Sequence, residues 1–183
     1  MKLHESIDQR LREFIDAQPM FFVATAPAGA DGHVNVSPKG GRGTLVVLDP
    51  LRVAYLDYTG SGAETIAHLR DNGRITLMWC AFAGPPNIVR VHGTGRAVLP
   101  TDPDFDGLLA AFDAPDRHGL RSVIEVTADR VSDSCGFQVP LMEYVGDRDL
   151  LTRWTERKSE SDLDEYRAQK NARSIDGLPA LKS

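Results

Sequence analysis

The sequence has few cysteines and no long apolar run, and these absences exclude several classes of protein. The two thiols, Cys80 and Cys135, form neither a disulfide framework nor a CxxC metal pair, so we expect reduced thiols in a cytoplasmic protein. No apolar run reaches transmembrane length, and the first residues lack the apolar core of a signal peptide. Acidic residues outnumber basic ones, 26 against 21, and the resulting net charge of −5 argues against binding nucleic acid or an anionic membrane.

Several catalytic motifs are also absent. There is no GxSxG elbow, no Walker A loop and no HExxH. The segments "GTGRAV" and "GSGAET" fall short of a dinucleotide fingerprint, because the first lies inside an expected strand and the second lacks the last glycine. The histidines show no ligand spacing, so we expect no metal site; they are His4, His33, His68, His92 and His118.

The hydrophobic pattern predicts a mainly β protein with flanking helices. Leu3, Ile7, Leu11 and Ile15 recur at helical spacing and predict an amphipathic helix that ends before Pro19. Short segments rich in Val, Ile, Thr and aromatic residues then follow, separated by turn signals: "MFFVATA", "HVNVS", "TLVVL", "RVAYLD", "RITLMWCAF", "NIVRVHGTGRAVL" and "SVIEVTADRVSDS". Six or seven strands joined mostly by short turns favour an antiparallel barrel or sandwich.

Helical patterns return in the second half of the chain. Phe105, Leu108, Leu109 and Phe112 predict a helix over residues 102–112. Beyond Tyr144 the sequence is charged with a thin apolar stripe, which indicates one or two helices packed on the barrel or on a partner subunit, then a loose tail. We therefore divide the chain into residues 1–145, the barrel with its N-terminal helix, and residues 146–183, a C-terminal helical extension and tail.

The stretch "LDYTGSGAETIAHL" is typical of an anion site, because a strand runs through a Gly-rich turn into a helix. Ser61 and Glu64 fit a capping box. A capped helix with no ligand is the alternative; we expect both a cap and a phosphate site, with neutral donors: the side chains of Ser61 and Thr65 and the amides of Gly62 and Ala63. Glu64 must then turn back to the capping box or pair with a cation, for which we consider Arg42, Arg90 and an arginine of a partner chain.

Cations with flanking glycines mark a second candidate, the loop from Ser37 to Arg42, and Arg90 lies in the middle of an expected strand. A solvated hairpin turn is the alternative for the loop, and a surface ion pair is the alternative for Arg90. For Cys135 we favour a buried inert thiol, and we expect His92 to be hydrogen-bonded or solvated on one strand face.

In their order along roughly residues 20–140, these pieces resemble the pyridoxamine 5'-phosphate oxidase-like proteins, which are FMN-binding split barrels. The resemblance is carried by "FFVATA", "HVNVSPKG", "VAYLDYT" before a helix, "NGRITLMW" and "VRVHGTGRAV", and short members of the family also share "GSGxETIAHL", "SCG" and "SIDGLP". It implies an antiparallel split β-barrel and a homodimer, with FMN sites at the interface that are built from both chains.

Carried over residue by residue, the resemblance implies that the segment from Asn35 to Lys39 faces the isoalloxazine ring and that Tyr58-Thr59 lies near the phosphate. It also implies that the later strand, "NIVRVHG" with Arg90, touches the ring. Lys39, and after it Arg90, would stabilise the reduced flavin. Together with the donors of the Gly-rich turn, the candidate cofactor-binding residues are Asn35, Val36, Ser37, Pro38, Lys39, Tyr58, Thr59, Ser61, Gly62, Thr65 and Arg90.

The sequence departs from the oxidase pattern at two places. Ala63-Glu64-Thr65 stands where the oxidase has Ser-Arg-Lys, and Gln138 stands where it has an arginine near the C-terminus. We therefore expect an FMN oxidoreductase acting on a small-molecule redox substrate other than pyridoxamine 5'-phosphate, with its catalytic residues open. A non-catalytic flavin or haem carrier or sensor, a deazaflavin-dependent reductase on the same fold and a structural dimer without cofactor remain alternatives.

Overall fold

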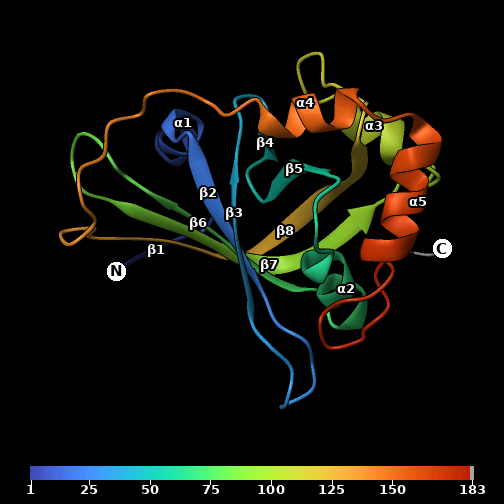
Figure 1. Ribbon diagram of the computed structural model, residues 1–183. Helices are drawn as coiled ribbons and strands as arrows, with labels where there is room; N and C mark the ends of the chain where they lie inside the picture. The colour runs from blue at the N-terminus through green and yellow to red at the C-terminus, as the bar shows by residue number, and fades with distance from the viewer. Residues whose placement is uncertain (182–183) are drawn as a thin grey trace.

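The computed structural model describes residues 1–181 and is built around one antiparallel sheet (Figure 1). The strands are β1 (Lys2–His4), β2 (Met20–Thr25), β3 (Asn35–Gly40), β4 (Leu45–Asp49), β5 (Arg52–Tyr58), β6 (Arg74–Cys80), β7 (Ile88–Val98) and β8 (Leu120–Ser134). The helices are α1 (Gln9–Ala17), α2 (Glu64–Asp71), α3 (Phe105–Leu109), α4 (Leu150–Glu156) and α5 (Glu160–Lys170).

The sheet curls into a half-barrel with flanking helices, which confirms the predicted fold class. Its strands follow the order β3-β2-β6-β7-β8-β5-β4, and β1 pairs separately with β8. Every pair is antiparallel, and the longest strands, β7 and β8, pair along most of their length. The path ends at the edge strands β3 and β4, and β1 forms a further short edge because it pairs with β8 alone.

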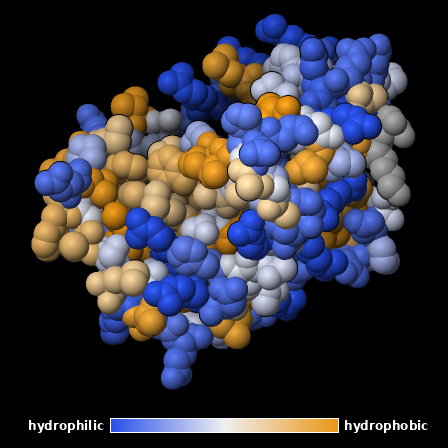
Figure 2. Space-filling model, turned by 90° about the horizontal axis from the view of Figure 1, so that it is seen from below, coloured by the Kyte–Doolittle hydropathy of each residue, from blue (hydrophilic) through white to orange (hydrophobic). Residues whose placement is uncertain are grey.

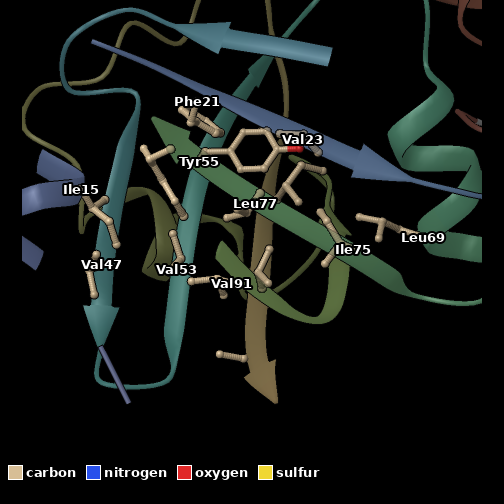
Figure 3. Close-up of a cluster of buried hydrophobic side chains, with 14 of the residues drawn as sticks. Ile15, Phe21, Val23, Val47, Val53, Tyr55, Leu69, Ile75, Leu77 and Val91 are labelled. Atoms are coloured by element: carbon tan, nitrogen blue, oxygen red, sulfur yellow. The ribbon is translucent and has the colours of Figure 1, made fainter. Parts of the chain in front are cut away.

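The main hydrophobic core fills the concave side of the sheet. Phe21 packs edge-on against Tyr55 at 5.4 Å between ring centroids and stacks on Trp79 at 5.9 Å. Leu11 and Ile15 of α1 and Ile66 of α2 bury their side chains completely or nearly so in this cluster. Figure 3 shows strand and helix residues converging on this space; those labelled are Ile15, Phe21, Val23, Val47, Val53, Tyr55, Leu69, Ile75, Leu77 and Val91.

The first helix begins later than its hydrophobic spacing predicts. Leu3 belongs to β1, lies opposite Ser132 of β8 and is exposed. The helix starts after Asp8, whose carboxylate accepts a hydrogen bond from the backbone N–H of Leu11 at 2.8 Å. This N-cap fixes the start of the helix, so the apolar residues before it extend the pattern only by coincidence.

Two further predictions on local structure were wrong. The helix expected over 102–112 is limited to α3, although Phe105, Leu109 and Phe112 are buried as the pattern requires. The tail expected to be loose is packed: Ala180 is fully buried in the main core, and its N–H donates to the carbonyl of Ala172 at 2.9 Å. A buried alanine carries too weak a hydrophobic signal to be recognised in a charged segment.

Candidate functional site

A pocket of about 470 Å³ lies between β3, the end of β5, the turn into α2 and the start of β8. Nine of the predicted cofactor-binding residues line it: Asn35, Ser37, Pro38, Lys39, Tyr58, Thr59, Ser61, Gly62 and Thr65. Arg121 of β8, Leu151 of α4 and Glu64 at the start of α2 also line it. The fold therefore brings together two of the three sequence segments that the family resemblance singled out.

Val36 and Arg90 do not line this pocket. Side chains alternate along a strand, so Val36 points away from Asn35 and Ser37 and is 61% exposed. Arg90 lies on β7, opposite Ser132 of β8, and its Nη1 donates to Oγ of Ser134 at 3.1 Å. Within one chain, these two residues belong to other surfaces.

The turn from Thr59 to Ala63 contains unpaired backbone donors, and its residues Gly60, Ser61 and Gly62 line the pocket. Within residues 1–181, the N–H groups of Gly60, Ser61, Gly62 and Ala63 donate no hydrogen bond. The first turn of α2, which follows directly, adds the unpaired N–H groups found at every helix start. This cluster of amides at the positive end of a helix is suited to an anion.

The capping box expected at this turn was wrong. The helix begins at Glu64, its N-cap is Ala63, and no side chain caps it. The Glu64 carboxylate accepts instead from the backbone N–H of Ile175, at 3.1 and 3.2 Å. The negative charge is therefore used to hold a segment that is distant in sequence, and neither Arg42 nor Arg90 pairs with it within the described chain.

A buried charge cluster adjoins the pocket and was missed from the sequence. Asp57 is 1% exposed and lies 2.9 Å from Nζ of Lys39 and 2.8 Å from Nε of Arg121. Burial opposes ionisation of Asp57, but the two neighbouring cations outweigh it and hold the pKa of this carboxyl well below its usual range. Two cations share one anion, so the cluster is net positive beside the pocket.

Arg121 also ties the pocket turn to the C-terminal extension. Its Nη1 donates to the carbonyl of Gly62 at 2.8 Å and to Oδ1 of Asn171 at 2.9 Å. Asn171 in turn donates to the carbonyl of Gly60 at 2.9 Å. In the sequence, the signal for this charge cluster was Asp57, a carboxylate in an otherwise apolar strand, because a buried acid requires a cationic partner.

The C-terminal extension contributes a further cation. Nε of Arg167 in α5 donates to Oγ1 of Thr59 at 2.9 Å, and the Arg167 side chain is largely buried. Beyond α5, Asp176 accepts from the backbone N–H of His33 at 2.8 Å and pairs with its ring Nδ1 at 2.7 Å. The extension is thereby fastened both to the pocket turn and to the β2–β3 hairpin.

Outside the pocket, the prediction for Cys135 was wrong and the prediction for His92 was confirmed. Cys135 is exposed, so the expected burial of this thiol was wrong: it lies just beyond the last residue of β8, where the sheet no longer covers it. His92 is hydrogen-bonded, with Nδ1 3.0 Å from Oγ1 of Thr76.

In the part of the chain that the structure describes, no three His, Cys, Asp or Glu side chains are grouped to hold a metal ion, and no helix is long and apolar enough to span a membrane.

An open antiparallel half-barrel with helices on its flanks and a pocket at its edge is the architecture of a split-barrel protein. A model of the family described as Pyridoxamine 5'-phosphate oxidase matches residues 7–135. The "Pyridoxamine 5'-phosphate oxidase family protein ustO" of Aspergillus flavus is 41% identical over 194 residues, covering 98% of this chain and 78% of that protein. The chain belongs to the pyridoxamine 5'-phosphate oxidase family.

Solved structures agree on the fold. HupZ from group A Streptococcus superimposes with a TM-score of 0.53 at 19% identity, covering 70% of this chain and 99% of that one. The conserved hypothetical protein Rv2991 from Mycobacterium tuberculosis gives a TM-score of 0.50 at 16% identity, covering 80% and 99% respectively. At these identities the likeness establishes the shared architecture alone.

Proposed function

We propose that the protein is an FMN-binding oxidoreductase that acts on a small molecule. The observation that carries this proposal is the pocket itself, which combines unpaired amides of the lining residues Gly60, Ser61 and Gly62, a net positive charge cluster and the polar face of an edge strand. These groups match the two ends of FMN, a phosphate and a planar ring with polar edges. Family membership supports the same cofactor.

The phosphate is assigned to the turn between Thr59 and Thr65. Its free amides supply hydrogen bonds, and Arg121 supplies the charge that the family's Ser-Arg-Lys segment would otherwise provide. Arg121 has four hydrogen bonds to Asp57, Gly62 and Asn171, which leaves one Nη2 N–H for a ligand. In this proposal the cation comes from β8 in space and not from the turn in sequence.

The flavin ring is assigned to the edge strand β3. Asn35, Ser37 and Lys39 share the face that lines the pocket. The ion pair with Asp57 orients Lys39, and its Nζ lies 5.8 Å from the centre of the Tyr55 ring. A cation held at the ring edge would favour the reduced, anionic flavin, and FMN itself would supply the hydride or electron transfer.

We also propose a homodimer in which a second copy helps to close the cofactor site. The segment after β8 exposes large apolar side chains that are unusual on an isolated surface; they are Phe137, Leu141, Met142 and Val145. Figure 2 shows apolar residues gathered on one half of the face seen from below, while the other half is largely hydrophilic. Val36 and Arg90, which lie outside the pocket of their own chain, would then be available to the other site.

Pyridoxamine 5'-phosphate is not the substrate in this proposal. Gln138, in the place of the oxidase arginine, is exposed and carries no charge. A substrate phosphate desolvated there would lack a charge-assisted hydrogen bond of roughly 1.5–3 kcal/mol. We expect no turnover of this compound in a direct oxidase assay, and efficient turnover would show that the substrate site lies elsewhere.

Reconstitution with FMN tests the proposed function. The apoprotein is titrated with FMN while flavin fluorescence is recorded, and the complex is then mixed with NADH or NADPH under anaerobic conditions. Stoichiometric binding followed by bleaching of the flavin absorption supports an oxidoreductase. Binding without reduction by either nucleotide would favour a carrier or sensor, and absence of binding would contradict the cofactor assignment.

A further inference from the structure

A chain of hydrogen bonds runs from the floor of the pocket into the interior. Nδ2 of Asn35 donates to Oγ1 of Thr25 at 3.1 Å and to Oγ1 of Thr65 at 3.2 Å. Oγ1 of Thr25 lies 3.0 Å from Nδ1 of His68. Thr25 is 4% exposed and His68 is fully buried, and neither lines the pocket. Within the described residues, this chain of hydrogen bonds connects His68 to the pocket through Thr25 and Asn35.

The direction of this chain depends on the tautomer of His68: Nδ1 accepts from Thr25 when it is unprotonated and donates to Thr25 in the other tautomer. The hydroxyl of Thr25 accepts from Asn35, so its own proton is available for Nδ1 of His68. A neutral imidazole with its proton on Nε2 accepts that bond. Nε2 is buried and has no partner within residues 1–181, so the Nδ1 end is where this side chain is held. In the tautomer with Nδ1 unprotonated, the heavy-atom distances fit a chain directed from Asn35 through Thr25 to His68.

In that tautomer, the direction of the chain favours one orientation of the Asn35 amide. A rotation by 180° would turn Oδ1 toward Thr25 and Thr65, and Thr25 would then have to give its proton to Asn35 instead of His68. In the arrangement present, Oδ1 accepts from Oγ of Ser37 at 2.9 Å. Because a carbonyl oxygen has two lone pairs, one is left for a ligand in the pocket.

We propose that His68, in the tautomer with Nδ1 unprotonated, and Thr25 are positioning residues that make Asn35 a hydrogen-bond acceptor toward the flavin. The oxidised isoalloxazine ring has a single N–H, at N3, and the assigned partner of that group is Oδ1 of Asn35. This inference rests on the proposed function, because it concerns the ring end of the same pocket. It assigns a role to a buried histidine that the binding residues alone do not explain.

A flavin that lacks the N3–H isolates this bond. The apoprotein is titrated with FMN and with 3-methyl-FMN, and the ratio of the two Kd values is determined for the parent. We expect FMN to bind about five- to tenfold more tightly, as one net hydrogen bond provides. In Thr25→Val and in His68→Leu the amide is free to turn, and the ratio should fall by most of this factor.

Two controls separate positioning from loss of structure. Thr25→Ser keeps the hydroxyl and should retain the parent's ratio. Thr76→Val removes the equivalent hydroxyl from the Thr76–His92 pair, which has the same 3.0 Å distance but lies outside the pocket, and should leave the ratio unchanged. General loosening of the fold would weaken both flavins equally and would not alter the ratio.

The outcomes of this titration are distinct. Equal affinity of the parent for the two flavins, or an unchanged ratio in Thr25→Val and His68→Leu, would overturn the inference and leave the FMN assignment intact. Failure of the parent to bind either flavin would overturn the proposed function and the inference together. A thermal melt of each apoprotein confirms that the variants compared are folded.

Discussion

Replacement of Arg121 by methionine should destabilise the cofactor-free protein severely. The guanidinium is 6% exposed, and its removal leaves Asp57 buried with Lys39 as its one remaining cationic partner. It also removes the donors to Gly62 and Asn171 that join the pocket turn to the C-terminal extension. Breaking a buried ion pair in this way costs about 3–5 kcal/mol.

The size of the effect is within easy reach of denaturation experiments. At about 2–4 °C per kcal/mol for a chain of this length, the expected loss corresponds to a decrease in Tm of roughly 6–20 °C. Urea unfolding followed by far-ultraviolet circular dichroism gives the free energy of unfolding directly. Both measurements use the apoprotein, so neither depends on the identity of the ligand.

Arg117→Met is the matched control for this substitution. Arg117 lies shortly before β8, and its side chain is 65% exposed and paired with the exposed Asp106. A surface pair of this kind contributes about 0–1 kcal/mol. If Arg121→Met proves no more destabilising than Arg117→Met, the buried cluster does not hold the pocket together as described.

Three further predictions concern other parts of the chain. The backbone carbonyl of Thr155 and the Glu160 carboxylate raise the pKa of His118. The contribution of His118 to stability is therefore complete below its ordinary pKa of about 6.5 and is lost as the pH rises through the raised pKa. The difference in Tm between the parent and His118→Gln should shrink from pH 6 to pH 9, and a constant difference would contradict this. Cys135 is exposed, whereas burial raises the pKa of Cys80. Ellman's reagent should therefore modify Cys135 rapidly in the native chain and Cys80 only after denaturation. Rapid modification of both thiols would refute the assigned burial. Arg167→Gln should weaken FMN binding about tenfold through the loss of charge beside Thr59, as measured by fluorescence titration, whereas the exposed Arg153→Gln should not.

Local patterns were sufficient to predict the mainly β class and the strands from β2 to β8, whereas β1 was predicted to be part of the first helix; the family resemblance pointed to most of the residues that line the pocket. Asn35, Ser37 and Lys39 alternate on one strand, and Tyr58 and Thr59 end another, so their shared position follows from strand geometry and the family order. These features depend on residues close together in the sequence, where periodicity and turn chemistry carry the information.

The missed features depend on contacts between distant segments. Arg121 reaches the turn at Gly62, and Arg167 reaches Thr59 across 108 positions of the chain. Glu64 is compatible with a local capping box, but a backbone N–H from the tail provides its actual partner. No local pattern in a charged C-terminal extension specifies where it docks, so its part in the site emerges only from the fold.

The most direct test of the central claim is the ratio of the Kd values for FMN and riboflavin, measured on the same apoprotein at low salt. Riboflavin retains the ring and lacks the phosphate. Two charge-assisted hydrogen bonds of about 1.5–3 kcal/mol each would make FMN bind roughly 10²–10⁴-fold more tightly. A ratio in this range supports the phosphate assignment to the Thr59–Thr65 turn and Arg121. Equal affinity for the two flavins would contradict it.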